Sequence, residues 1–330
     1  MESVLQVQDL TVCYGSGRRR PVTAVNGVSF NLAAGEAIGI LGESGCGKST
    51  LALALPGLLP SNAYIQRGSI LFRGVDLGKL TERQLQKIRG AGISLVHQEP
   101  ALALNPVIRV GHQVAEVLRA HKSISSSQAR EEARGLLAQV GLAAESRIDE
   151  AYPHQLSGGQ RQRVVIAQAI ACQPALLIAD EPTTALDMAV QVEILALLRN
   201  LQQKLNLALI LISHDPALLT HLVHRILVMY AGRVVEAGHT QDLLQKPLHP
   251  YTQGLLGCRL ATSTGDLQGR LLAAIPGEPP DMASVAPGCA FAPRCPARME
   301  VCETRSPDET MPGNGRRVRC FKYEEQAERS

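Results

Sequence analysis

The chain has 330 residues, enough for one large α/β domain with an appendage or for two ordinary domains. Its formal net charge of +3 is too close to neutral to indicate a nucleic-acid-binding protein, and aromatic residues are only 3%, so a core must rest on aliphatic side chains. The longest apolar runs, such as 51–59 and 207–212, are shorter than the roughly 18 residues of a membrane-spanning helix. The N-terminus lacks the basic and apolar regions of a signal peptide. We therefore expect a soluble, cytoplasmic protein that contacts a membrane only through a partner.

Strands and helices alternate along most of the chain. Apolar and polar residues alternate from Val28 to Leu32, which predicts a half-buried strand, and residues 110–140 have a helical composition with a helix start at Ser125–Ser127. Apolar residues at helical spacing from Ile194 to Leu205 predict another helix. This alternation predicts a mainly parallel sheet that is covered on both faces. Continuous apolar runs predict its buried strands at 37–41, 176–179, 207–212 and 225–230.

The composition changes after about residue 255. Residues 276–320 are rich in proline, glycine, arginine and cysteine and show no periodicity, so this segment cannot bury much apolar surface by itself. We therefore expect a separate, small and irregular module that needs a metal or a cofactor to become ordered, because a cytosolic chain does not normally keep disulfides. Four cysteines crowd into this tail: Cys289, Cys295, Cys302 and Cys320.

Residues 42–49 read GESGCGKS and match the phosphate-loop pattern G-x-x-x-x-G-K-[ST]. Glycines let the backbone wrap a phosphate chain with its N–H groups pointing inward, and the helix expected to begin near Lys48 adds its positive end. We expect Lys48 to reach the β- and γ-phosphates of ATP and the Ser49 hydroxyl to bind Mg²⁺. Although a thiol at a helix N-terminus can ionise, we interpret Cys46 as a tolerated small residue. The nucleotide-binding residues expected here are Gly42, Ser44, Gly45, Cys46, Gly47, Lys48, Ser49 and Thr50.

A second motif places two acids, Asp180 and Glu181, directly after the apolar run 176–179. Such a strand puts both carboxylates at the edge of the sheet, beside the phosphate loop. Asp180 is expected to hold Mg²⁺ through water, and Glu181 to polarise the attacking water as a general base. Two solvated acids after a strand are common by themselves, but together with a phosphate loop they indicate nucleotide hydrolysis.

The string LSGGQ at 156–160 lies between these two motifs and resembles the signature of ATP-binding cassette proteins. The resemblance covers roughly residues 3–255. It implies an α/β fold, a P-loop NTPase (RecA-like) sheet with an antiparallel β part and a helical subdomain at about 99–165, in a nucleotide-binding domain over 1–255. It also implies that two ATP molecules lie between two cassettes and that the signature completes the site of the second subunit. The signature residues implied to bind nucleotide are Ser157, Gly158, Gly159 and Gln160.

Other positions are similar to further motifs of that family. Tyr14 lies where an aromatic ring stacks on adenine, and Gln98 resembles the glutamine that links Mg²⁺ and the attacking water to the helical subdomain. Residues 185–187 resemble the D-loop, and His214 resembles the switch histidine that contacts the γ-phosphate. The resemblance therefore implies Glu181, His214 and Gln98 as the catalytic set, with Gln98 also at the Mg²⁺ ion.

Finer features resemble one importer group, which takes up oligopeptides and dipeptides. They are QEP at 98–100, YPHQ at 152–155, HPYT at 249–252 and the cysteine pattern of the extension 256–330. The resemblance implies an ATPase on the cytoplasmic face of the membrane, with two transmembrane permeases, an extracytoplasmic binding protein and a second, different cassette. An importer of nickel, glutathione or another solute stays open. An exporter or a non-transport ATPase is disfavoured, because the chain has no fused spanning helices, second phosphate loop or long coiled-coil insertion.

The tail cysteines carry a separate expectation. Members of the peptide-importer group with this pattern are associated with a [4Fe–4S] cluster, so the resemblance implies that Cys289, Cys295, Cys302 and Cys320 bind one. A zinc ion is the alternative, although structural zinc sites usually use short-spaced C-x₂-C pairs, and these four cysteines form none. The role implied is structural or redox-sensing, away from the ATP chemistry.

Overall fold

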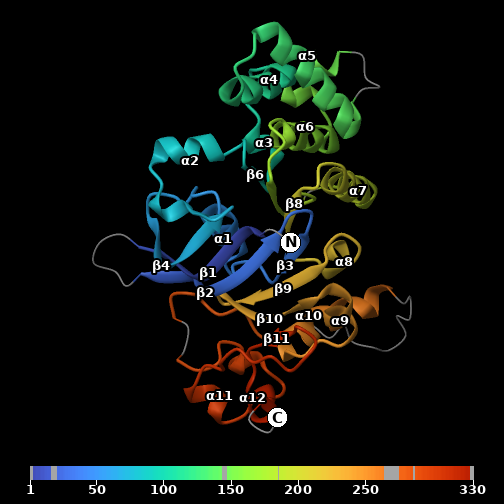
Figure 1. Cartoon of the computed structure of the whole chain (residues 1–330). Helices are drawn as coiled ribbons and strands as arrows, with labels where there is room; N and C mark the ends of the chain where they lie inside the picture. The colour runs from blue at the N-terminus through green and yellow to red at the C-terminus, as the bar shows by residue number, and fades with distance from the viewer. Residues whose placement is uncertain are drawn as a thin grey trace.

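The computed structural model describes residues 3–15, 21–142, 147–184, 186–263, 275–284 and 287–327. Figure 1 shows three parts along the long axis of the molecule. A helical part lies at the top, two β-sheets with their flanking helices lie in the middle, and the C-terminal tail lies at the bottom. In the described ranges no helix is both long and apolar enough to cross a membrane.

The larger sheet is mainly parallel. Its strands lie in the order β11 (Arg317–Val318), β10 (Arg233–His239), β9 (Arg225–Tyr230), β3 (Ala37–Leu41), β8 (Ala208–Ser213), β7 (Leu176–Asp180) and β6 (Ile93–Val96). From β9 to β6 all neighbours pair in parallel, whereas β10 and β11 are antiparallel additions at one edge. Every residue of β3, β7 and β8 is buried, which explains their unbroken apolar runs and confirms the predicted parallel core.

The smaller sheet is antiparallel and packs beside the first. Its order is β2 (Val22–Ala33), β1 (Ser3–Tyr14), β4 (Ala63–Phe72) and β5 (Val75–Asp76). The short helix α1 (Lys48–Ala54) shares one apolar core with both sheets, because Leu51, Leu5 and Ile40 are all fully buried in the same cluster. This shared core fixes α1, and with it the turn that precedes α1.

The helical part is built on α4 (Val110–His121), α5 (Ser126–Leu137) and α6 (Gly158–Ile170), with the single turn α3 (Pro100–Ala103) joining it to β6. The predicted helix start at Ser125 is confirmed. Its hydroxyl accepts the N–H of Gln128 at 3.2 Å, and the Gln128 side chain accepts the N–H of Ser125 at 2.9 Å. This reciprocal capping satisfies two of the free N–H groups at the helix start.

The remaining helices flank the sheets and the tail. Figure 1 shows α7 below the helical part and α11 with α12 at the opposite end of the molecule. The spacing predicted from Ile194 to Leu205 is realised in α7, whose buried residues Ile194, Leu198 and Leu201 face the core. The bounds are α2 (Glu82–Ile88), α7 (Met188–Lys204), α8 (Pro216–Leu219), α9 (Thr240–Gln245), α10 (Pro250–Ser263), α11 (Val301–Thr304) and α12 (Phe321–Ala327).

The tail is joined to the larger sheet, which differs from the separate and wholly irregular module expected from its composition. Strand β11 extends the sheet by pairing Val318 with Glu236 of β10. The fully buried Glu236 carboxylate binds the Arg316 guanidinium and also accepts the N–H groups of Leu248 and His249. Burying a carboxylate is costly without such partners, so Glu236 ties the tail to the sheet through polar contacts that composition does not reveal.

Candidate functional site

The turn at residues 42–47 joins β3 to α1 and rests on two of its glycines. A Cβ atom at Gly47 would lie 2.2 Å from the carbonyl oxygen of Ala24, and one at Gly42 would lie 2.3 Å from that of Met229. Gly45, with φ at +79°, has nothing within 4 Å of such an atom. The turn is thus packed against β2 and β9 on one side and open at Gly45, which leaves exposed backbone for a bound anion.

The Lys48 side chain turns back into this loop. It is 4% exposed, and its ammonium group donates to the carbonyl oxygens of Gly42 at 2.7 Å and Glu43 at 2.9 Å. The predicted phosphate-binding cation therefore lies inside the loop. The neighbouring Cys46 is buried, and burial raises the pKa of its thiol although the charge of Lys48 opposes this. The interpretation of Cys46 as a tolerated small residue stays a prediction.

Asp180 ends β7 and is buried beside the loop. Burial raises the pKa of its carboxyl group; the hydrogen bond with Ser49 and the charge of Lys48 lower it, and the charge of Glu181 raises it. Among the described residues, its Oδ1 oxygen finds no hydrogen-bond partner. An orphaned carboxylate oxygen next to a hydroxyl is the oxygen donor set that Mg²⁺ prefers, so Asp180 and Ser49 fit a magnesium ion.

The structure brings the three predicted catalytic side chains together. Glu181 has a left-handed backbone, with φ at +46°, and its Oε2 oxygen lies 3.2 Å from Nδ1 of His214 and 3.5 Å from Nε2 of Gln98. Thr184 donates its hydroxyl to the same oxygen at 2.9 Å. Sequence reasoning missed Thr184. The only available signal was its place three residues after Glu181, where a hydroxyl can hydrogen-bond back within a turn.

Tyr14 and the signature residues occupy two other places. Tyr14 ends β1, and its hydroxyl lies 3.2 Å from that of Thr50 on α1, so the ring stands beside the loop. Ser157 is the exposed N-cap of α6, accepts the N–H of Gln160 at 3.2 Å, and in turn donates its own N–H to the Gln160 side chain at 2.7 Å. A Cβ at Gly159 would lie 2.6 Å from Val190 of α7, so this glycine allows close helix packing. In Figure 1, α6 belongs to the helical part and α1 to the sheets. In the string that resembles the D-loop, Ala185 lies outside the described residues.

The four tail cysteines gather in one small region. The N–H of Cys289 donates to the carbonyl oxygen of Cys302 at 2.8 Å. Burial raises the pKa of Cys320 to about 11, and the other three thiols add to this increase. Within the described ranges, however, no three His, Cys, Asp or Glu side chains are arranged to hold a metal ion. The thiols lie near one another but do not form a metal site in this arrangement.

Comparison with known proteins places this geometry in a family. Residues 25–184 match the family model "ABC transporter", and residues 235–302 match "Oligopeptide/dipeptide transporter, C-terminal region". The dipeptide transport ATP-binding protein DppD of Bacillus subtilis is 46% identical over 99% of this chain and 97% of that protein. The oligopeptide transport ATP-binding protein OppD of Escherichia coli is 45% identical over 97% of this chain and 94% of that protein.

Solved structures agree on the cassette. The dimeric post-hydrolysis state of the ATP-binding cassette MJ0796, bound to ADP and Pi, superposes with a TM-score of 0.64 at 28% identity, covering 72% of this chain and 98% of that one. The CbiO1 protein of Clostridium perfringens superposes with a TM-score of 0.65 at 26% identity, covering 82% and 96%. The chain therefore belongs to the oligopeptide and dipeptide transport ATP-binding proteins, which are ATPases of ABC transporters.

Proposed function

We propose that this chain hydrolyses MgATP as one of two cassettes in a membrane transporter and that the hydrolysis powers the import of peptides. The observation that carries the proposal is the meeting of Gln98, Thr184 and His214 at a single carboxylate oxygen of Glu181. Relatives that match nearly the whole chain are named for the transport of dipeptides and oligopeptides, which supports peptides over the other solutes of the group.

At the nucleotide, the ring of Tyr14 would stack on adenine, and the open backbone at Gly45 would receive phosphate oxygens. Lys48 would exchange its two carbonyl partners for the β- and γ-phosphates. Ser49, Asp180 and Gln98 would hold Mg²⁺, which neutralises charge on the phosphates. The orphaned oxygen of Asp180 supports this, because binding a cation would remove the cost of a buried unpartnered carboxylate.

Glu181 would act as the general base on the attacking water. Its carboxylate is held by the Thr184 hydroxyl, so its direction is fixed before substrate arrives. His214, with a side chain 61% exposed, can reach from the same oxygen to a γ-phosphate. Gln98 lies between β6 and α3 and can transmit changes at this oxygen to the helical part.

The partners proposed are a second cassette, two transmembrane permeases and an extracytoplasmic binding protein, with this chain at the cytoplasmic face of the membrane. The exposed cap of α6 supports contact of Ser157 with a nucleotide on the second cassette. Leu102 and Val107, which are 82% and 77% exposed in and after α3, support a protein contact on the helical part. We favour a pair of two different cassettes over a pair of identical ones. We also propose that the chain divides into a nucleotide-binding domain over 1–255 and a C-terminal extension, the tail, over 256–330.

A cluster or metal on Cys289, Cys295, Cys302 and Cys320 also remains a proposal, with [4Fe–4S] ahead of zinc. Support comes from the proximity of the cysteines, since the N–H of Cys289 donates to the carbonyl oxygen of Cys302 at 2.8 Å. Because the described side chains do not form a metal site, ligation requires the thiols to move together and to lose their protons. No step of ATP hydrolysis depends on this group.

Replacing Asp180 by Asn tests the magnesium site through stability. Without Mg²⁺, the ionised carboxylate is disfavoured in the folded protein, so Asp180→Asn should raise the free energy of unfolding by about 1 kcal/mol near pH 8. The gain should shrink as the pH falls through the raised pKa of Asp180, because the wild-type carboxyl then becomes neutral. Thermal unfolding in EDTA over a pH series measures this, and MgATP hydrolysis should be lost. The exposed Asp242→Asn is the control; a gain that grows toward acid would contradict the assignment.

Replacing Glu181 by Gln tests the general base. The amide keeps the size of the side chain and can still accept the Thr184 hydroxyl, so ATP binding should persist while hydrolysis falls roughly 10²-fold or more. The mutant should also accumulate a closed, ATP-bound pair of cassettes. Steady-state hydrolysis by the assembled transporter measures the loss. Glu193→Gln, an exposed change on α7, should hydrolyse ATP normally. A hydrolysis rate for Glu181→Gln close to wild type would show that the base lies elsewhere.

Replacing Ser157 by Asp tests the composite site better than a change at Gly159, where any side chain would strike Val190. Asp is as good a helix N-cap as Ser, so α6 should stay intact while a negative charge is added where a partner-bound phosphate would dock. ATP should bind to the mutant as before, but ATP-driven cassette association should weaken roughly tenfold or more. Ser157→Asn keeps the cap without the charge and should associate more tightly than Ser157→Asp. Equal association of the Asp and Asn variants, measured by sedimentation, would refute the composite site.

Anaerobic purification tests the tail proposal. The full-length protein should be brown and contain iron and acid-labile sulfide, and Cys295→Ser should bleach it and make the tail sensitive to protease. Cys172→Ser, which changes a thiol in the helical part, should keep the colour. A colourless preparation with one bound zinc would replace the cluster by zinc, and one without metal would show that the thiols are free.

A further inference from the structure

Glu43, the second residue of the phosphate loop, is held by an arginine from the tail. The guanidinium of Arg294 donates from Nη1 to Oε2 of Glu43 at 2.7 Å and from Nη2 to Oε1 at 2.9 Å. The two residues are 251 positions apart, and the Arg294 side chain is only 5% exposed. A bidentate ion pair that is shielded from solvent is strong and geometrically specific, because each carboxylate oxygen has its own N–H donor.

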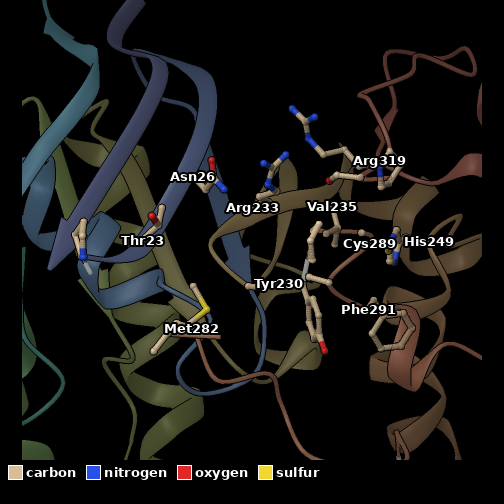
Figure 2. Close-up of a pocket in the computed structure, with 18 residues that line it drawn as sticks. Thr23, Asn26, Tyr230, Arg233, Val235, His249, Met282, Cys289, Phe291 and Arg319 are labelled. Carbon is tan, nitrogen blue, oxygen red and sulfur yellow. The ribbon is translucent and has the colours of Figure 1, made fainter. Parts of the chain in front are cut away.

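The backbone of Glu43 is held from the same side. Its N–H group donates to the hydroxyl of Tyr251 at 2.8 Å, and Tyr251 is fully buried. The Tyr251 ring packs against Tyr230 and against Phe291 of the tail, with ring centroids 4.5 Å and 5.4 Å apart. Figure 2 shows Tyr230 and Phe291 beside a cavity of about 300 Å³ between the start of β2 and the tail. The Tyr251 hydroxyl, which accepts the N–H of Glu43, is therefore held in place by aromatic packing.

The backbone carbonyl of Glu43 contacts the nucleotide site. Its carbonyl oxygen accepts a hydrogen bond from the Lys48 ammonium at 2.9 Å. Arg294 of the tail therefore holds the side chain of Glu43, and Tyr251 at the start of α10 holds its N–H, while its carbonyl oxygen contacts Lys48 inside the loop. Each of the three guanidinium nitrogens of Arg294 has a partner, since its Nε donates to the carbonyl oxygen of Pro276 at 2.9 Å and its Nη1 also lies 3.5 Å from the Tyr230 hydroxyl.

We propose that Arg294 of the tail and Tyr251 of α10 are positioning residues for the phosphate loop, so that their contacts with Glu43 set the affinity of this ATPase for ATP. Arg294 acts in two ways. It holds the loop in one shape, which lowers the ordering entropy lost on nucleotide binding, and it neutralises a carboxylate that would otherwise repel the phosphates. Because neither residue reaches the carboxylate of Glu181, the affinity should depend on them far more than the rate of the chemical step.

The primary experiment separates affinity from catalysis in the full-length chain. Arg294→Gln should raise the Kd for a fluorescent ATP analogue about tenfold, which corresponds to about 1.4 kcal/mol. At saturating ATP, the kcat of the assembled transporter should stay within about threefold of wild type. The matched control is Arg298→Ala, which breaks an exposed ion pair with Glu303 in the same tail and should leave both constants unchanged.

Two further variants distinguish positioning from a merely structural role. Adding Glu43→Gln to Arg294→Gln removes the unpaired carboxylate and should recover at least half of the lost affinity on a logarithmic scale, whereas lost tail packing would not be repaired by a change in the loop. Tyr251→Phe keeps the buried ring and removes only the hydroxyl, so it should fold and raise the Kd about threefold. If Arg294→Gln does not fold, the Kd of Tyr251→Phe tests the proposal instead. An unchanged Kd in folded Arg294→Gln or Tyr251→Phe, or no recovery in the double variant, would overturn the proposal.

Discussion

The parallel register of β3, β8 and β7 is the constraint on which the nucleotide site depends. Leu41 pairs with Ser213, and Asp180 pairs with Ile212, so the three strands end at the same edge of the sheet. Whatever follows each strand must then meet there, and the chain supplies the phosphate loop, Glu181 and His214 at these points. The fixed spacing of neighbouring strands, rather than any local contact, brings together groups that are far apart in the sequence.

Two buried carboxylates show how the same fold uses charge for different purposes. Glu236 is surrounded by donors, with Arg316 and two backbone N–H groups on its oxygens, and it stabilises the junction between sheet and tail. Asp180 is also buried but has an oxygen without a partner among the described residues. Glu236 is compensated within the protein, whereas the unpartnered oxygen of Asp180 is available to a ligand, which is the observation behind its proposed role at Mg²⁺.

The sequence predicted features that depend on local pattern. Apolar runs revealed the buried strands, Ser125 with Gln128 revealed a helix start, and short motifs revealed the phosphate loop and the paired acids. Contacts across long separations carried no such pattern. Arg294 lies in a segment without periodicity, and nothing in its neighbours shows that it pairs with Glu43. Composition indicated that the tail has little core of its own. Its attachment includes a two-residue strand, the ion pairs of Arg316 and Arg294, and the packing of Phe291 on Tyr251, and these features have no compositional signature.

The nucleotide site is therefore contacted from both ends of the molecule. From the helical part, Gln98 reaches the Glu181 carboxylate, and from the tail, Arg294 reaches Glu43 in the phosphate loop. Figure 1 places these two parts at opposite ends, with the sheets between them. The two contacts also differ in strength. The hydrogen bond between Gln98 and Glu181 is exposed and 3.5 Å long, whereas the ion pair between Arg294 and Glu43 is shielded and bidentate. A weak contact suits a group that must move during each cycle of hydrolysis, and a strong one suits a support that keeps the loop ready to bind. On the proposals made above, the tail would act as a fixed part of the ATP site, and the helical part as its moving connection to a partner.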